Sequence, residues 1–190
     1  MSHWPSTKAR RVLAALLGLG WVVKRQSGSH RTLSRAGWPD FVFAFHDGEE
    51  IPIKYTCEGA NVSPPLAWKD VPPGTRSLAL IVDDPDAPDP AEPTTPWVHW
   101  VGFDLPPDRT TLHENVGALT RGHVGLNDWR RAAWGGPCPP TGRHRYVFKL
   151  YALDRVLDLS RPTKAELERA MAGHILADAT MIGRYKLHRH

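Results

Sequence analysis

The sequence predicts a mainly β protein of antiparallel strands with few helices, preceded by a short α/β extension at the N-terminus. Short apolar runs of strand length alternate with loops rich in proline and glycine, and the 190-residue chain holds 18 prolines. A hydrophobic fraction of 41% is sufficient for a core and indicates a globular chain. No apolar run approaches the roughly 20 residues of a membrane span.

The charge balance of the chain changes near residue 40. Residues 1–40 hold seven Lys or Arg against Asp40 alone, a net charge of +6. The remainder holds 17 basic and 19 acidic residues, a net charge of −2, which agrees with +4 for the whole chain. This change indicates a boundary between a basic module or extension over residues 1–40 and a main domain over residues 41–190.

The N-terminal segment is expected to form a helix followed by strands. Ser6 and Thr7 are typical N-cap residues, and the apolar positions of residues 12–19 form one helical stripe. A strand, a turn and two further strands are expected over residues 21–25, 26–29, 30–33 and 41–45. A secretory signal is the alternative, but no cleavage pattern of small residues follows the apolar stretch.

The run from Gly20-Trp21 to Gly28-Ser29-His30, with its helix before and strands after, resembles HicA, the toxin of a bacterial toxin–antitoxin pair. That family is an mRNA interferase with a small α/β fold, and the resemblance implies His30 as its catalytic histidine and RNA as a possible partner of residues 1–40. The chain departs from HicA at Ile51–Tyr55, where the toxin continues into a second helix. We therefore interpret this module as incomplete, and an inactive basic extension is favoured over an active nuclease.

The main domain is expected to consist of strands separated by Pro/Gly loops and to contain one helix. Thr163 and Glu166 form a capping-box pair, so a helix should begin there and run to about Ala172, where Gly173 ends it. The proline-rich segment 85–96 is expected to be a surface loop next to the functional site. The principal strands are expected over residues 77–82, 97–103, 145–154 and 175–185.

Three of these strands carry a polar residue at one end of an otherwise apolar face. Because side chains alternate along a strand, the shared faces are Leu78, Leu80, Val82 and Asp84; Trp97, His99, Val101 and Phe103; and His144, Tyr146, Phe148 and Leu150. A carboxylate, two imidazoles and a phenol at the rim of one core are typical of a small-ligand site.

Asp83-Asp84-Pro85-Asp86-Ala87-Pro88, the aromatic-flanked His99, and the run from Gly135 to Tyr146 together resemble the phosphatidylethanolamine-binding protein family, also called Raf kinase inhibitor-like. The run from Tyr55 to Trp68 resembles the opening of its prokaryotic branch, and the resemblance covers about residues 45–185. It implies an antiparallel β-sandwich and a homodimer. It also implies ligand-pocket positions at Asp84, Asp86, His99, Gly136, His144 and Tyr146. Trp134 stands where prokaryotic members often have tyrosine.

Binding rather than turnover is the expected chemistry, with a phosphate-type ligand or a phospholipid headgroup. Near their ordinary pKa of about 6.5, His99 and His144 could donate to phosphate oxygens while Asp84 orients one imidazole. The remaining groups are assigned as follows: the amides of Gly135 and Gly136 form an anion nest, Pro137 stiffens the loop, and Tyr146 offers a hydroxyl.

An enzyme, a cofactor and a metal are not expected. No Ser or Cys nucleophile stands between a base and an orienting group, no C-x-x-C pattern is present, and no H-x-H pattern occurs at the candidate site residues. A protein-interaction module that inhibits a kinase or a serine protease through the loop 85–96 is the alternative, since the resembled family includes such inhibitors. Two cysteines indicate a reducing, cytoplasmic location by default, and whether Cys57 and Cys138 pair is left open.

Overall fold

The computed structural model describes residues 22–27, 30–34, 40–43, 47–116 and 122–188. For the first three of these segments it gives the course of the backbone. The helix expected near residues 6–20 lies outside the described residues. Within the described part of the chain, no helix is long and apolar enough to cross a membrane.

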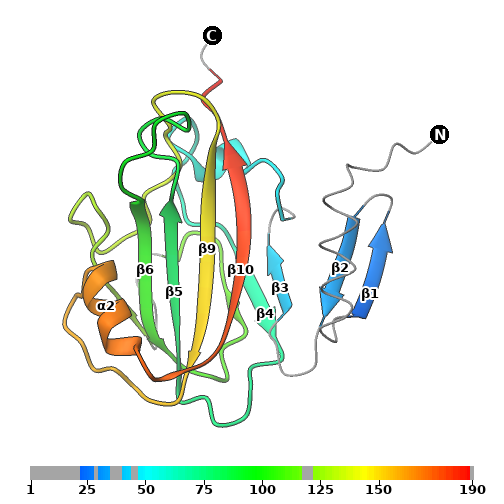
Figure 1. Cartoon of the computed structure of the whole chain (residues 1–190), viewed down its shortest axis with the longest axis vertical. Helices are drawn as coiled ribbons and strands as arrows, with labels where there is room; N and C mark the ends of the chain where they lie inside the picture. The colour runs from blue at the N-terminus through cyan, green and yellow to red at the C-terminus, as the bar shows by residue number, and fades with distance from the viewer. Residues whose placement is uncertain (1–21, 28–29, 35–39, 44–46, 117–121, 189–190) are drawn as a thin grey trace.

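The larger sheet has five antiparallel strands in the order β10-β9-β5-β6-β8 (Figure 1). Its strands are β5 (Ser77–Asp84), β6 (Trp97–Leu105), β8 (His123–Val124), β9 (His144–Leu153) and β10 (Ile175–Tyr185). The central strand β5 is buried along its whole length. This explains why its sequence is a continuous apolar run and not an alternating one.

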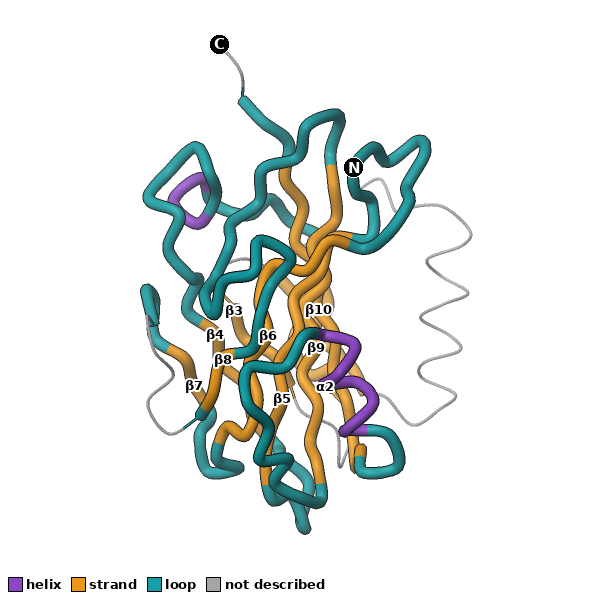
Figure 2. Tube along the Cα trace, turned by 90° about the vertical axis from the view of Figure 1, so that its left-hand side faces the viewer, coloured by secondary structure: helices purple, strands orange, loops and turns teal. Residues whose placement is uncertain are grey.

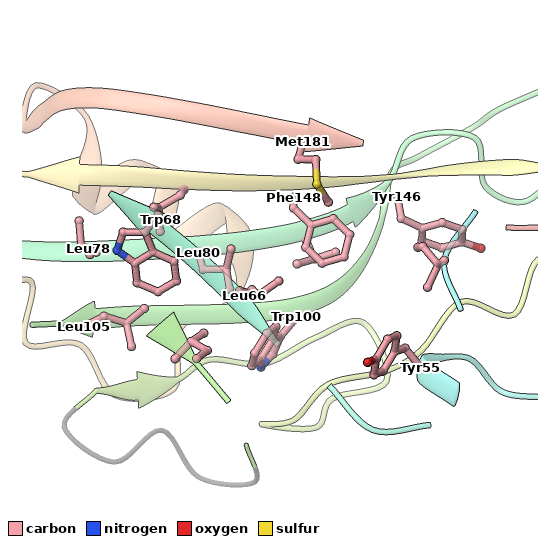
Figure 3. Packing of buried hydrophobic residues seen from close by; sticks show 14 of the residues in the cluster. Tyr55, Leu66, Trp68, Leu78, Leu80, Trp100, Leu105, Tyr146, Phe148 and Met181 are labelled. Atoms are coloured by element: carbon pink, nitrogen blue, oxygen red, sulfur yellow. The ribbon is translucent and has the colours of Figure 1, made fainter. Parts of the chain in front are cut away.

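The smaller sheet is antiparallel and has the order β3-β4-β7, with β3 (Asp40–Phe43), β4 (Leu66–Lys69) and β7 (Thr111–Leu112). Its buried Leu66, Trp68 and Leu112 belong to one core with Leu80 of β5 and Phe148 of β9. Figure 3 shows Leu66, Trp68, Leu80 and Phe148 among the side chains packed between the strands. Each such side chain contributes about 1.5–3 kcal/mol on burial, which holds the two sheets together as the expected sandwich.

The opposite face of the larger sheet is covered by helix α2 (Lys164–Met171), which Figure 2 shows on the far side from the smaller sheet. Its buried Leu167 and Met171 pack in a second apolar cluster with residues of β5 and β6. The expected capping box is present, because Thr163 accepts from the Glu166 amide and donates its own amide to the Glu166 carboxylate. Lys164 also reaches the buried carboxylate of Asp83 at 2.5 Å, which fixes the start of α2 to the sheet.

The N-terminal strands β1 (Val22–Ser27) and β2 (His30–Ser34) form a separate antiparallel hairpin, in which Ser27 pairs with His30. The strand expected at residues 41–45 does not extend this hairpin. It forms β3 and pairs with β4, so its backbone belongs to the smaller sheet of the sandwich (Figure 1).

The expected homodimer stays a prediction. Of the apolar residues of β10, Ile175 and Leu176 are exposed at its start, whereas Met181 is buried in the core.

Candidate ligand-binding site

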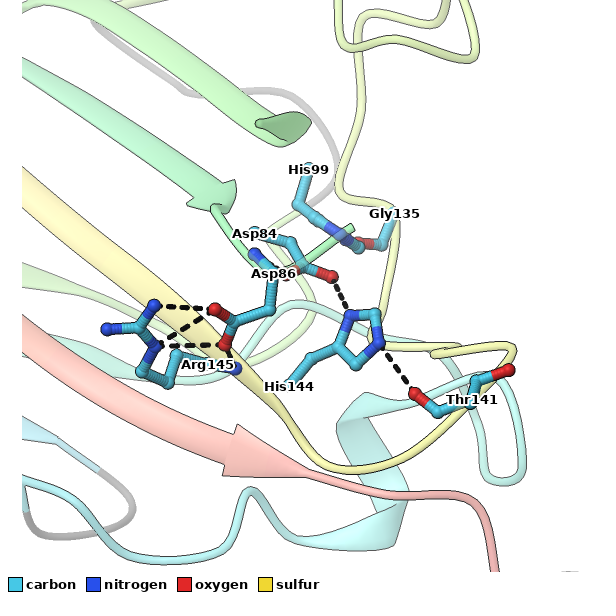
Figure 4. Close-up of polar contacts among 7 residues, drawn as sticks. All are labelled: Asp84, Asp86, His99, Gly135, Thr141, His144 and Arg145. Carbon is cyan, nitrogen blue, oxygen red and sulfur yellow. Dashed lines mark hydrogen bonds and ion pairs between the residues drawn. The ribbon is translucent and has the colours of Figure 1, made fainter. Parts of the chain in front are cut away.

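The polar residues expected to form the site gather where β5 and β6 meet the start of β9, beside the loop 135–143 (Figure 4). Asp84 ends β5, His99 lies near the start of β6, and His144 begins β9. The sequence pattern correctly placed Asp84, His144 and Tyr146 at the ends of their strands. The structure adds contacts that change what each group can do.

Asp84 and His144 form a buried pair. His144 Nδ1 lies 2.7 Å from Asp84 Oδ2, and His144 Nε2 donates to the carbonyl oxygen of Thr141 at 2.8 Å. Nε2 therefore carries a hydrogen, and one further proton must lie between Nδ1 and the carboxylate. The pair thus has no net charge, whichever partner holds that proton. Burial raises the pKa of Asp84, although its hydrogen bond with His144 acts in the opposite direction.

Asp86 forms an ion pair with Arg145. Its carboxylate accepts from the Arg145 amide at 2.8 Å and from Nε at 2.9 Å, and a second guanidinium nitrogen reaches Oδ1 at 2.5 Å. These hydrogen bonds from Arg145 lower the pKa of Asp86. Asp86 therefore anchors the loop after β5 to β9, and its charge is balanced within the protein.

His99 occupies a β-bulge that the sequence pattern did not reveal. Val82 pairs with Trp100 and Asp83 pairs with Val98, so His99 is an additional residue in β6. A bulge turns the bulged side chain away from the regular alternation of faces. The prediction that His99 shares a face with Val101 and Phe103 is therefore wrong. Those two residues lie in the cluster beneath α2, whereas the ring of His99 contacts Tyr146 on the opposite side.

The bulge also frees the carbonyl group of His99 from the strand ladder. This oxygen accepts from the Gly135 amide at 3.0 Å and from the Asn127 carboxamide at 3.4 Å. In return, His99 Nδ1 donates to the Gly135 carbonyl at 2.5 Å. This reciprocal contact fixes the tautomer of His99 with its hydrogen on Nδ1, which leaves Nε2 as an acceptor.

The expectation that His99 would carry a proton near neutral pH is wrong. Burial lowers the pKa of His99 to about 4, although the Gly135 carbonyl and Asp83 favour the charged form. At neutral pH, the imidazole is therefore neutral. It can accept a hydrogen bond at Nε2, but it cannot act as a cationic donor to a phosphate.

The expected anion nest at Gly135 and Gly136 is also wrong. The Gly135 amide donates to His99, and the Gly136 amide donates to Asn61 Oδ1 at 2.8 Å, so neither N–H faces a ligand. Close packing explains the glycines instead. A Cβ atom on Gly136 would lie 2.5 Å from the Tyr55 carbonyl oxygen. Pro137 belongs to the same contact, because its carbonyl oxygen accepts from the Cys57 amide at 3.0 Å.

Tyr146 is fully buried, and its hydroxyl finds no acceptor for its hydrogen in the described part of the structure, although the Cys138 backbone lies near its oxygen. Burial raises the pKa of this phenol, and the nearby Asp84 and Asp86 act in the same direction, so the hydroxyl keeps its proton. Its ring meets the ring of His99 edge to face, with the centroids 5.1 Å apart. Tyr146 is thus a buried donor without an acceptor, next to a buried acceptor.

Two residues that support the site were missed from the sequence. The carboxamide of the buried Asn127 donates to Ala133 and His99 and accepts from the Arg131 amide, so it ties the loop 127–135 to β6. Trp129 packs its indole against the ring of His99. Their position in a turn after a glycine-rich stretch carried no signal that distinguished them from ordinary loop residues.

Cys57 and Cys138 form a disulfide, with their Cα atoms 5.4 Å apart. This bond joins the segment after η1 (Ile53–Tyr55) to the loop that carries Gly135 and Gly136. The question of pairing is thereby answered. The argument from the cysteine count for a reducing compartment no longer holds, because disulfides persist mainly in oxidising surroundings. No group of three potential metal-ligating side chains occurs in the part of the chain that the structure describes.

Two family models match the chain. The model described as phosphatidylethanolamine-binding protein matches residues 42–186, and the model described as HicA toxin of bacterial toxin-antitoxin matches residues 9–56. The two matches share residues 42–56, a segment that includes the end of β3.

Similar curated proteins cover the larger match. A UPF0098 protein of Methanothermobacter thermautotrophicus is 52% identical over 148 residues, which is 75% of this chain and 95% of that protein. A UPF0098 protein of Aquifex aeolicus is 44% identical over 154 residues, which is 77% of this chain and 86% of that protein.

Solved structures agree with these matches. A phosphatidylethanolamine-binding protein homolog from Chlamydia trachomatis superimposes with a TM-score of 0.74 at 40% identity, covering 80% of this chain and 99% of that one. YbcL of E. coli superimposes with a TM-score of 0.68 at 31% identity, covering 77% of this chain and 97% of that one.

Proposed function

Because the chain belongs to the phosphatidylethanolamine-binding protein family, we propose that it binds a small phosphate-bearing ligand, free or as a phospholipid headgroup, at His99 and Tyr146. The observation that carries this proposal is the unsatisfied pair of buried polar groups. The Tyr146 hydroxyl has no acceptor for its hydrogen, and no hydrogen bond to His99 Nε2 occurs among the described residues. Buried polar groups in proteins nearly always have partners, and a ligand would supply both.

The chemistry of the pair favours a ligand that both accepts and donates hydrogen bonds. The Tyr146 hydroxyl can donate to a phosphate oxygen, and neutral His99 Nε2 can accept from a P–OH group or from an ammonium group. The nearby carboxylates of Asp84 and Asp86 are paired with His144 and Arg145. The two pairs together therefore carry no net positive charge, and they do not strongly repel a singly charged anion. A protonated phosphate monoester, such as that of phosphoethanolamine, meets these requirements.

The other site residues would act by positioning. The Asp84–His144 pair and the Asp86–Arg145 pair hold the start of β9, which carries Tyr146, against the end of β5. Gly135, Gly136 and Pro137 hold the loop that orients His99. Binding without turnover is what this arrangement supports, because no side chain in it is placed as an activated nucleophile.

Calorimetric titration with inorganic phosphate and with phosphoethanolamine tests the proposal. Tyr146→Phe removes one hydroxyl and keeps the ring, so we expect about a tenfold loss of affinity for both ligands, as one hydrogen bond of about 1.4 kcal/mol predicts. Tyr151→Phe is the matched control, because Tyr151 lies on the same strand β9 but packs against the cluster beneath α2. Equal affinity in the parent and in Tyr146→Phe, or no binding by the parent, would overturn the proposal.

We also propose RNA binding through residues 1–40, which would form a basic module apart from the domain of residues 41–190. The match to a HicA toxin model over residues 9–56 and the net charge of +6 support it. His30 is the first residue of β2 and pairs with Ser27 of β1.

A further inference from the structure

A cavity of about 210 Å³ lies against the outer side of the loop 135–138. Its walls include the indoles of Trp129 and Trp134, the side chain of Arg131, and the two glycines Gly135 and Gly136. His99 and Tyr146 are not among the residues that line it, and both are buried. This cavity therefore does not reach the two groups to which we assign ligand binding.

Trp129 both lines this cavity and contacts His99. Its ring meets the ring of His99 edge to face, with the centroids 5.1 Å apart. It also covers Gly135 so closely that a Cβ atom there would lie 2.4 Å from the indole carbon Cζ3. One side chain thus lines the cavity, rests on the loop, and touches the buried histidine.

The backbone at Trp129 is fixed, whereas its side chain is held only by ring contacts. Arg130 and Arg131 donate their amides to the carbonyl and the carboxamide oxygen of Asn127, which closes a short turn around Trp129. The indole itself makes no hydrogen bond within the described residues, and the Trp129 side chain belongs to a residue that is 38% exposed. Its ring centroid lies 5.4 Å from that of Trp97. Rotation of this side chain would break no polar contact.

We propose that Trp129 is the gate of the ligand site, and that its indole must turn away from His99 for a phosphate-bearing ligand to pass from the cavity to His99 and Tyr146. Arg131 stands at the mouth of this route and takes part in no ion pair among the described residues, so it provides a positive charge where an anion would enter. The identity of the ligand rests on the function proposed above, whereas the barrier formed by the indole does not.

The barrier can be tested without a ligand, by measuring the pKa of His99 by NMR in Trp129→Ala and in Trp97→Ala. Trp97→Ala is the comparison variant, because Trp97 is 39% exposed and its ring supports the ring of Trp129, so its removal loosens the indole but leaves it over His99. In the parent, burial holds the pKa of His99 at about 4. Opening the barrier admits water to the ring, so the pKa of His99 should rise by at least one unit in Trp129→Ala and by less in Trp97→Ala, where the indole of Trp129 remains. Asp83 and His144, the charged groups that also act on His99, are the same in both variants.

The passage is then tested with inorganic phosphate and phosphoethanolamine in stopped-flow experiments on the full chain. We expect association with Trp129→Ala to be at least tenfold faster than with Trp97→Ala, and Trp129→Phe to lie between the parent and Trp129→Ala. A thermal unfolding transition confirms that each variant is folded. If Trp129→Ala does not fold, Trp129→Phe, which retains an aromatic ring, takes its place in the comparison.

The outcomes separate the gate from the ligand. A raised pKa of His99 in Trp129→Ala with no phosphate binding by any variant would uphold the gate and reject the proposed ligand. An unchanged pKa with equal association rates in the parent and all variants would reject the gate and leave the proposed function standing.

Discussion

The carboxylate of Asp84 and the imidazole of His144 share one proton across 2.7 Å, and both side chains are almost completely inaccessible to solvent. The second nitrogen of the imidazole is committed to the Thr141 carbonyl. Neither residue is therefore free to hold a ligand in this arrangement. Their contact joins the end of β5, the start of β9 and the loop before β9, which places Tyr146 beside His99.

Removal of this buried pair should destabilise the protein strongly. His144→Ala leaves the Asp84 carboxyl buried without its partner, so we expect a loss of about 3–5 kcal/mol in the free energy of unfolding, measured with urea. His174→Ala breaks the exposed pair with Asp154 and should cost less than about 1 kcal/mol. Similar losses in the two variants would contradict the structural role of Asp84 and His144.

The stability of the protein should fall as the pH drops from about 6.5 to about 4, in part because of His99. Its pKa is lowered from 6.5 to about 4, so in this window the unfolded chain binds a proton that the folded chain does not. This contribution to the free energy of unfolding is fully present above pH 6.5. It is lost as the pH falls to about 4, and the total loss is about 3 kcal/mol. His99→Asn, whose carboxamide nitrogen can replace Nδ1 toward Gly135, should show a smaller loss of unfolding free energy between pH 7 and pH 4.5. An identical pH dependence in the parent and in His99→Asn would exclude this explanation.

Gly136→Ala should be destabilising because of a steric conflict and not because of a lost anion site. The added methyl group would lie 2.4 Å from Asn61 Oδ1 and 2.5 Å from the Tyr55 carbonyl oxygen. Overpacking of this kind costs about 1–3 kcal/mol, and the hydrogen bond from Gly136 to Asn61 would be lost as well. Gly122→Ala is the control, because its methyl group meets the mobile end of the Leu105 side chain and should cost less. Unfolding in urea measures both, and equal costs would contradict the packing argument.

Loss of the disulfide should lower the stability by about 4 kcal/mol. Cys57 and Cys138 are 81 residues apart, and closing a loop of that length removes much of the entropy of the unfolded chain. A reducing agent should therefore lower the melting temperature of the parent, whereas it should not affect the Cys57→Ser/Cys138→Ser variant. A melting temperature that is the same with and without the reducing agent would show that the bond contributes nothing.

The basic N-terminal segment should give salt-dependent RNA binding. Phosphate neutralisation by Lys and Arg releases counterions, so the affinity should fall steeply as the salt concentration rises. Lys24→Glu/Arg25→Glu should weaken binding and reduce the salt dependence, as measured by fluorescence anisotropy with labelled mRNA. We expect no cleavage, because the toxin's second helix is replaced by a different domain. Cleavage by the parent that disappears in His30→Ala would show instead that nuclease activity survives.

The four principal strands and the helix of the main domain were predictable because each has a local signal, whereas the short strands β4, β7 and β8 were not predicted. The capping box at Thr163 and the apolar run of β5 depend only on neighbouring residues, and both were placed correctly. Alternation also placed Tyr146 correctly, because β9 has no bulge where it pairs with β5.

The charge state and the hydrogen-bonding partners of the site residues could not be predicted from residue types. The bulge at His99 arises from the pairing of β6 with β5, and its partners Gly135 and Asn127 come from distant loops. Burial then reverses the expected charge of His99. Gly135 and Gly136 have the sequence of an anion nest, but their amides are used by His99 and Asn61, which only the tertiary structure reveals.

The pairing of β3 with β4 determines where the chain can be divided. The two family matches overlap, yet the backbone of Asp40–Phe43 is hydrogen-bonded along Leu66–Lys69. A shortened chain that starts after Phe43 would leave β4 as an unpaired edge next to the buried Leu66 and Trp68, and such an edge invites aggregation. A cut intended to isolate the ligand-binding part should therefore come before Asp40, so that the sandwich keeps its first strand.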